Sequence, residues 1–232
     1  MITPQHIKIK KGAMAERVIV AGDADRIKML SHLLKGAKLL NKTRFLVYTG
    51  TYNRKRISLV SHGIGMPSIA IALEEVIAFG GREIVRLGTA GGLIREIKYG
   101  DIILATSASC KKGGTLWEYF PKLKSTTFYP NPSLTSKIED LLAKGGKRFF
   151  KGPIFSSNAF YSEAALTKNK RFIGVEMEAA ALFKLAEFRK VKAAAVFVAS
   201  DNVVLKTPLL DSKHLSKQIN YTAKIVMDAL TS

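Results

Sequence analysis

The chain has 232 residues, enough for a sizeable core, and we expect a single domain over residues 1–232. Hydrophobic residues make up 47% of it, and 37 Lys and Arg against 18 Asp and Glu give a formal net charge of +19. No apolar run reaches the roughly 18–20 residues that span a bilayer, and no signal sequence is recognisable, so we expect a cytoplasmic protein without a membrane segment. The single cysteine, Cys110, excludes an intrachain disulfide.

The basic residues form short clusters along the whole chain, mostly in predicted turns and at helix ends. No recognition helix, zinc finger or aromatic-basic strand motif accompanies them. We interpret them as a solvated basic surface without a specific nucleic-acid partner. A basic nucleic-acid-binding protein is the alternative from a different functional class.

The first half of the chain alternates apolar runs with turns that contain glycine. RVIVAG at 17–22 predicts a buried strand, which a helix follows to about residue 34. Pro67 suits the first turn of a helix that ends at Gly80 and Gly81. The strands expected in this half, including a hairpin around NRK, are 17–22, 44–52, 56–62 and 83–89.

The second half continues the alternation of strands and helices. Residues 110–132 are rich in Gly, Pro and aromatic side chains and predict a functional loop. Because strands alternate with helices and are apolar on both faces, the sequence predicts an α/β fold with a central mixed, mostly parallel sheet flanked by helices. The further elements expected are strands 101–109, 149–155 and 193–200 and helices at about 133–144, 174–188 and 215–230.

Polar residues follow the carboxyl ends of the predicted strands, where α/β sheets bind ligands. Arg86 lies inside an apolar strand, and a buried guanidinium needs an anion because it cannot lose its charge. With Arg26, the Thr89 hydroxyl and glycine-flanked backbone N–H groups, it would form an oxyanion cradle. An internal salt bridge to an acid elsewhere is the alternative for each arginine.

Three carboxylates are further candidate functional residues. Glu176 and Glu178 open the apolar stretch GVEMEAAALFKLAEF, although carboxylates are rarely buried unless they are paired. They share one face if the chain is extended there, and they diverge by about 200° if it is helical. Asp201 ends an apolar strand, where burial would raise its pKa and suit a general acid. An Asx turn or a helix cap is the alternative for Asp201.

The sequence contains no His or Cys spacing that suits a metal, so we expect no metal ion. It also lacks the Walker, GxGxxG and GxSxG motifs, and we expect no cofactor. On context alone, His6 is an exposed histidine in an N-terminal arm, and His62 is structural.

The motifs AGDADR, YTGTY, SHGIGMPS, VRLGTAGG, FSSNAFY, GVEMEAAALF and VASDN occur in the order found in the nucleoside phosphorylase superfamily. Over residues 3–229 the chain resembles the trimeric and hexameric purine and uridine phosphorylases of bacteria and archaea. It is most similar to archaeal enzymes that act on purine nucleosides and methylthioadenosine. The resemblance implies the phosphorylase fold, a homo-oligomer that is a homohexamer or a trimer, and a pentosyltransferase of purine salvage that uses inorganic phosphate as a co-substrate.

The resemblance also implies a role for each residue of the cluster. Phosphate would be bound by Gly22, Arg26, Arg86 and Thr89, and by Arg44 of a neighbouring subunit. The nucleoside would be bound by Phe160 at the base, by Met177 and Glu178 at the sugar, and by His6 of a neighbouring subunit at the 5′ position. Glu176 would reach the base or a hydroxyl, or brace the site from behind. Asp201 would protonate N7 of the departing purine.

The chain departs from the family pattern in four places, one of which, Ala24 in place of a proline in GDADR, should be tolerated. Arg44 lies one residue closer to YTGTY than the family's arginine does. Because successive side chains of a strand alternate, this shift can turn the Arg44 side chain to the other face. The arginine that assists the acid in bacterial purine enzymes is missing, with Lys213 and His214 near its place. The Gln–Arg pair of uridine enzymes is absent from FYSEAALTK, which favours purines. A uridine phosphorylase and a water-using nucleosidase are the alternatives, although water needs no anion cradle.

Overall fold

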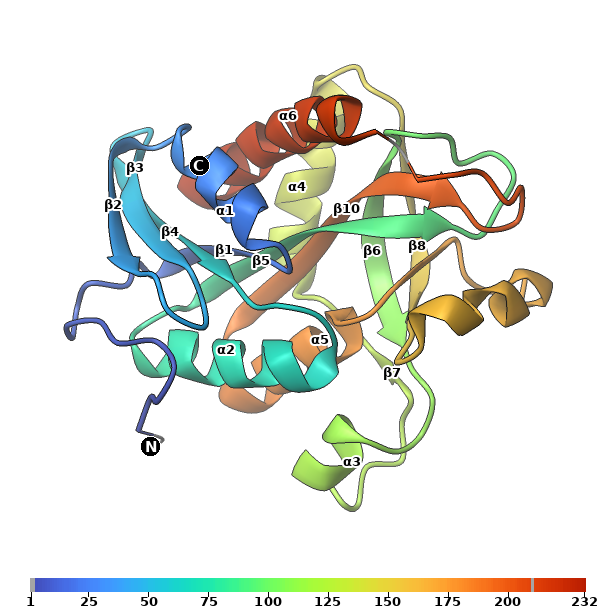
Figure 1. Cartoon of the computed structure of the whole chain (residues 1–232), viewed down its shortest axis with the longest axis horizontal. Coiled ribbons are helices and arrows are strands. Elements are labelled where there is room, and N and C mark those ends of the chain that lie inside the picture. Colours follow the sequence, from blue (N-terminus) through green and yellow to red (C-terminus); the bar gives the residue numbers. More distant parts are fainter. Residues whose placement is uncertain (1–2, 210) are drawn as a thin grey trace.

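A twisted sheet runs through the molecule, with helices on both of its faces (Figure 1). The computed structural model describes residues 3–209 and 211–232. The strands are β1 (Arg17–Ala21), β2 (Lys35–Asn41), β3 (Val47–Tyr52), β4 (Lys55–Ser61), β5 (Glu83–Gly92), β6 (Ile102–Ser109), β7 (Thr127–Phe128), β8 (Phe149–Ser156), β9 (Gly174–Glu176) and β10 (Lys192–Asn202). The helices are α1 (Ala24–Ser31), α2 (Met66–Ala78), α3 (Thr115–Tyr119), α4 (Pro132–Lys144), the 3-10 helix η1 (Phe160–Lys168), α5 (Ala179–Arg189) and α6 (Ser212–Thr231).

The sheet closes on itself over part of its width. Its order is β10-β6-β8-β9-β5-β1-β4-β3-β2, and β10 also pairs with β5. The strands β5, β10, β6, β8 and β9 therefore form a ring, from which β1, β4, β3 and β2 extend. Pairing is parallel for β4–β1–β5–β10 at the centre. It is also parallel for β6–β8–β9, and it is antiparallel for β10–β6, β5–β9, β6–β7 and β2–β3–β4. The expected mixed sheet is confirmed, but parallel and antiparallel pairs are equally common among the described strands.

The alternation of side chains along β1 explains why both faces of the strand are apolar. Val18 and Val20 join the hydrophobic cluster under α2 and α5. Ile19 and Ala21 join the cluster under α1, α4 and α6 on the opposite face. Successive side chains of a strand point to opposite faces, so a sheet between two helical layers buries both sets.

The structure corrects several predicted elements. Strand β2 was not expected, because most of KGAKLLN is exposed at the edge of the sheet and has no alternating apolar pattern. Helix α1 ends at Ser31 rather than near residue 34. The predicted loop at 110–132 contains the short elements α3 and β7. The stretch 174–188 starts as strand β9, and helix α5 starts only at Ala179. In the described residues no helix combines the length and the apolar character needed to cross a membrane.

Candidate active site

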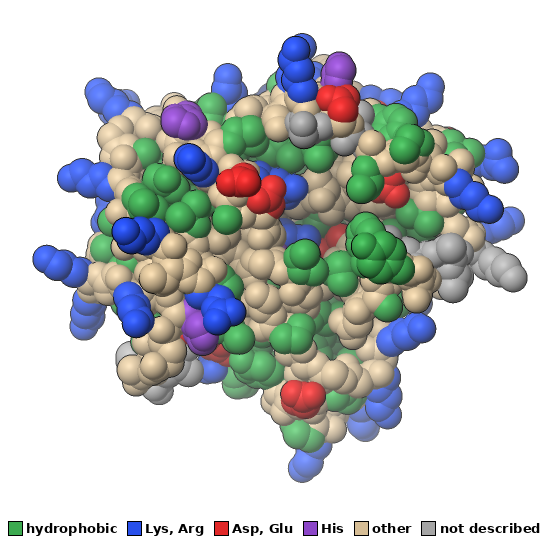
Figure 2. Space-filling view, viewed as in Figure 1, with side chains coloured by type: hydrophobic (Ala, Val, Ile, Leu, Met, Phe, Trp, Pro, Cys, Tyr) green, Lys and Arg blue, Asp and Glu red, His purple; other side chains and the backbone are tan. Residues whose placement is uncertain are grey.

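A cavity of about 550 Å³ opens where β1, β5 and β10 end. Figure 2 shows it as a hollow near the centre of this face, with cationic and acidic side chains visible inside, whereas other Lys and Arg side chains stand around the outline. Nine of the eleven residues predicted from the sequence line it, namely Gly22, Arg26, Arg86, Thr89, Phe160, Glu176, Met177, Glu178 and Asp201. The cavity therefore lies where the sequence predicted a ligand site, beyond the carboxyl ends of the strands.

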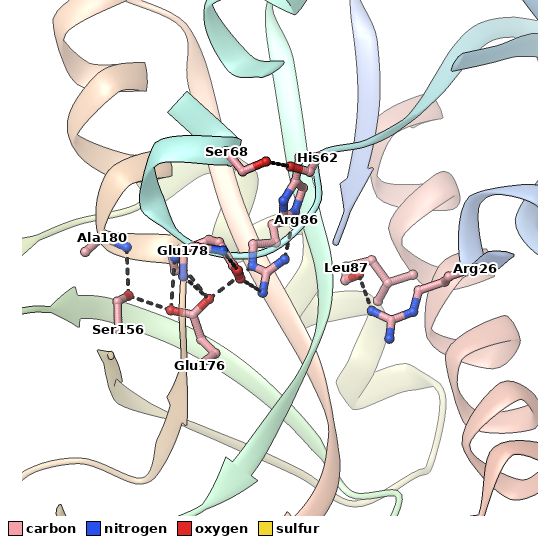
Figure 3. A network of polar contacts seen from close by, with 11 residues as sticks. Arg26, His62, Ser68, Arg86, Leu87, Ser156, Glu176, Glu178 and Ala180 are labelled. Atoms are coloured by element: carbon pink, nitrogen blue, oxygen red, sulfur yellow. Dashed lines mark hydrogen bonds and ion pairs between the residues drawn. The ribbon is translucent and has the colours of Figure 1, made fainter. Parts of the chain in front are cut away.

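Arg86 is the centre of a buried polar network in this cavity (Figure 3). Its Nε donates to Glu176 at 3.1 Å, and its two terminal nitrogens bond to Glu178 and, at 2.9 Å, to Nε2 of His62. The internal salt bridge considered for Arg86 is thus present. A guanidinium has five N–H groups, so two remain for a ligand after these three bonds.

Gly88 makes room for the Arg86 side chain. A Cβ atom at this position would lie 2.8 Å from the Phe197 ring and 3.1 Å from Cζ of Arg86. The guanidinium lies 5.4 Å from the centroid of the same ring, within the range of a cation–π contact. Glycine at 88 therefore lets two large side chains stack inside the sheet.

His62 supports Arg86 as a neutral base. Burial and the charge of Arg86 hold the pKa of His62 well below 6.5, so the imidazole is uncharged. Since Arg86 donates to Nε2, the ring proton is on Nδ1. The sequence suggested only that His62 is structural; no short motif links it to an arginine 24 residues away.

Arg26 approaches the network from α1, whose first turn is capped by the Asp23 side chain. It donates to the carbonyl of Leu87 at 3.3 Å (Figure 3). Its Nε is buried and has no acceptor among the described residues, an uncommon state for a polar atom. Burial and the neighbouring Arg86 lower the pKa of Arg26 to about 10, which leaves it cationic at neutral pH. An anionic ligand would satisfy both the charge and the unused donor.

Glu176 is fully engaged by the protein. Its carboxylate accepts from the Ser156 hydroxyl and from the backbone N–H groups of Glu178 at 2.8 Å and Ala179 at 3.0 Å. With the bond from Arg86, it therefore caps the start of α5 and fixes the guanidinium. The chain is extended in β9 up to Glu176, so both glutamates can reach the same arginine.

Glu178 has fewer protein partners than Glu176. It accepts from Arg86 and, at 2.5 Å, from the backbone N–H of Gly65, which has a φ of +88°. Burial raises the pKa of Glu178, and Arg86 opposes that rise. Met177, between the two glutamates, lines both this cavity and an adjoining groove. Glu178 is consequently the carboxylate that is better placed to exchange a protein contact for a ligand.

Asp201 enters the cavity because β10 contains a bulge. The register with β5 shifts between Ala199 and Asp201, so Ser200 is the extra residue, and both Ser200 and Asp201 line the cavity. The Ser200 hydroxyl donates to Asp201 at 2.9 Å, and burial raises the pKa of Asp201. His214, near the place of the missing arginine, instead lies 2.6 Å from Asp211 at the surface.

His6 and Arg44 do not line the cavity of their own chain. His6 is bonded to Glu75 of α2 at 2.8 Å through Nδ1. Arg44 is exposed in the loop between β2 and β3. The described residues also contain no cluster of three or more potential metal ligands.

Residues 16–230 match the model of the family described as the phosphorylase superfamily. The chain belongs to the phosphorylase superfamily. It is 36% identical over 208 residues to a DeoD-type purine nucleoside phosphorylase of Clostridium beijerinckii, with 86% of each chain covered. It is 32% identical over 224 residues to one of Streptococcus pyogenes, covering 94% of this chain and 93% of the relative.

Solved structures of superfamily members share the fold. A uridine phosphorylase of Vibrio fischeri superposes with a TM-score of 0.89 at 25% identity, covering 100% of this chain and 98% of the other. A purine nucleoside phosphorylase of Toxoplasma gondii in complex with immucillin-H gives 0.88 at 21% identity, covering 99% and 96%. The predicted family and fold are confirmed, and this phosphorylase superfamily member is a pentosyltransferase of the nucleoside phosphorylase type.

Proposed function

We propose that this enzyme catalyses the reversible phosphorolysis of purine nucleosides, giving the free base and ribose 1-phosphate, with 5′-methylthioadenosine among its substrates. The observation that carries the proposal is the placement of two cations, the buried Arg86 and the partly buried Arg26, with the carboxylates Glu178 and Asp201 in one cavity. The cations suit an inorganic anion, and the carboxylates suit a sugar diol and a base nitrogen.

Phosphate would occupy the cationic side of the cavity. The unused donors of Arg26 and Arg86 and the Thr89 hydroxyl would bind its oxygens. Gly22 would donate its backbone N–H, and its neighbourhood is tight, because a Cβ there would lie 3.0 Å from the carbonyl oxygen of Gly63. Phosphate is a co-substrate in this proposal, and no metal or cofactor takes part.

The nucleoside would lie across the carboxylate side. Glu178 would accept from the ribose hydroxyls, Met177 would pack on the sugar, and Glu176 would orient Arg86 and the backbone around them. Phe160, whose side chain is 49% exposed at the cavity mouth, would stack on the base. Asp201 would then face the purine ring.

The chemistry follows from this placement. A phosphate oxygen forms the new bond to C1′ as the bond from C1′ to N9 breaks, and the electron pair of that bond moves to the base. Asp201 gives its proton to N7, which neutralises the departing purine. The sugar acquires oxocarbenium character, which the phosphate and the Glu178 carboxylate stabilise electrostatically.

A second copy of the chain would complete the site. The cavity adjoins an open groove of about 550 Å³ that shares Ile64 and Met177 with it. Ile64 is 77% exposed, and Ile71 and Tyr119 add further exposed apolar surface to the groove. A neighbouring subunit on this face would cover these side chains and bring its His6 and Arg44 to the cavity. We extend this to a homohexamer that functions in cytoplasmic purine salvage.

The substrate class is tested by a panel of nucleosides assayed with phosphate. We expect inosine, guanosine, adenosine or methylthioadenosine to give free base and a sugar 1-phosphate. Uridine should react at least about tenfold more slowly, a factor that corresponds to the free energy of one lost hydrogen bond. The likeness to the Vibrio fischeri uridine enzyme makes uridine the relevant competitor. Faster turnover of uridine than of every purine nucleoside would overturn the purine assignment.

A further inference from the structure

A buried carboxylate, that of Glu75 in α2, binds the N-terminal arm to the body of the protein. Glu75 is 3% exposed and accepts from three successive backbone N–H groups: those of Gln5 at 2.9 Å, His6 at 3.0 Å and Ile7 at 2.6 Å. It also contacts Nδ1 of His6 at 2.8 Å.

These contacts determine which nitrogen of the His6 ring carries the proton. Burial would raise the pKa of Glu75, but the bonds from Gln5, from the His6 ring and from Ile7 lower it below its usual value, so the group is a carboxylate. A carboxylate only accepts hydrogen bonds, and therefore Nδ1 must be the protonated nitrogen. Nε2, the opposite nitrogen, is left as a hydrogen-bond acceptor in the neutral ring.

The same arm is joined to the loop that carries Arg44. Asn41 accepts from the backbone N–H of Lys8 at 3.1 Å and donates to the carbonyl of His6 at 3.3 Å. The rings of His6 and Phe45 lie 5.8 Å apart. His6 is thus held by Glu75 on one side and contacts Asn41 and Phe45, on either side of Arg44, on the other.

We propose that Glu75 is a positioning residue for the neighbouring subunit's active site: it fixes the arm and the tautomer of His6, so that Nε2 accepts the 5′-hydroxyl hydrogen bond of the nucleoside. The inference rests on the proposed function, because it takes the 5′ end of a nucleoside as the partner of His6. Glu75 acts only through His6 and does not itself touch the substrate.

Kinetics with a nucleoside that lacks the 5′-hydroxyl group test this role. With inosine, Glu75→Ala should lower kcat/KM about tenfold, the size of one hydrogen bond, and with 5′-deoxyinosine by less than about twofold. In a His6→Ala background the same substitution should add less than about twofold with either nucleoside, because the two residues act as one unit.

Glu74→Gln provides a matched control on the same helix. Glu74 is also buried, but it pairs with Arg189 of α5 at 2.9 Å and, among the described residues, makes no hydrogen bond or ion pair with the arm. The Glu74→Gln substitution should therefore change kcat/KM for inosine and for 5′-deoxyinosine by the same factor. An equal effect of Glu75→Ala on the two nucleosides, or an undiminished effect without His6, would overturn the inference while leaving phosphorolysis intact.

The ¹⁵N ring signals of His6 test the tautomer directly. Oε1 of Glu75 accepts from the backbone N–H of Gln5 and lies 2.8 Å from Nδ1 of His6, so it can only act as an acceptor toward the ring. We expect the Nδ1–H pattern in the wild-type enzyme and a shift toward the Nε2–H pattern in Glu75→Ala, which removes the acceptor of Nδ1. An unchanged pattern would refute the tautomer argument. A wild-type enzyme without phosphate-dependent turnover would instead refute the proposed function, and this inference with it.

Discussion

Replacing Asp201 by asparagine isolates the proposed proton donation to the base. The two side chains have nearly the same shape, and the amide oxygen can still accept the bond that Ser200 donates at 2.9 Å. The bulge in β10 that aims residue 201 at the cavity involves only backbone, so it should persist. The variant therefore removes an acidic proton with little change in geometry.

The expected loss follows from what the amide retains. General acid catalysis contributes about 10²–10⁴-fold, and an amide N–H that still bonds to N7 recovers about tenfold of it. We expect kcat for inosine to fall by about 10–10³-fold, or roughly 1.4–4 kcal/mol of barrier. The KM for phosphate should stay within about twofold, because Asp201 is not among the groups proposed to bind phosphate.

The pH profile gives the sign of the effect. A general acid works in its protonated form, and burial raises the pKa of Asp201 above its usual 3.8. The wild-type rate should therefore fall as the pH rises through that raised pKa, and this limb should disappear in Asp201→Asn. Ser200→Ala removes the hydrogen bond that lowers the pKa of Asp201, so it should move the limb to higher pH. A phosphate KM that rises as much as kcat falls would show that Asp201 is structural and refute this reasoning.

Three further substitutions test other parts of the site. Arg26→Leu should raise the phosphate KM roughly 10–100-fold in steady-state assays, the size of one charge-assisted hydrogen bond, and an unchanged KM would remove Arg26 from the cradle. Glu176→Gln weakens the pairing of a buried guanidinium, so chemical denaturation should show a loss of about 2–3 kcal/mol, and no loss would argue against its bracing role. Gly88→Ala places a Cβ 2.8 Å from Phe197 and should cost about 1–3 kcal/mol, seen as a lower Tm; a wild-type Tm would contradict the packing argument.

Much of the cavity could be predicted because its residues obey a local rule. Gly22, Thr89 and Asp201 lie at or near the carboxyl ends of β1, β5 and β10, and parallel strands bring those ends to one edge. Arg86 was conspicuous because a charged residue interrupts an apolar strand. The resemblance of the motifs to a known family then gave each residue a role.

Other features depend on contacts between distant parts of the chain. The ring of strands requires β9 to pair with both β5 and β8, and no periodicity in a strand of three residues encodes that. Glu74 and Glu75 are adjacent in a helix, a pattern typical of a solvated face, yet both side chains are buried. The partners of Glu75 lie about 70 residues away in the sequence, and that of Glu74 lies 115 residues away. The windows used for reading hydrophobic periodicity do not reach that far. The contact between His62 and Arg86 could not be predicted for the same reason, because 24 residues separate them.

The dependence of base release on phosphate is the most direct test of the anion cradle formed by Arg26 and Arg86. Purified enzyme is incubated with inosine or adenosine in a phosphate-free buffer, and phosphate is then added in steps while free base and ribose 1-phosphate are measured. We predict that base release is negligible without phosphate, saturates as phosphate increases, and matches the sugar phosphate mole for mole. Base release at the same rate without phosphate, with free ribose as the product, would contradict the account.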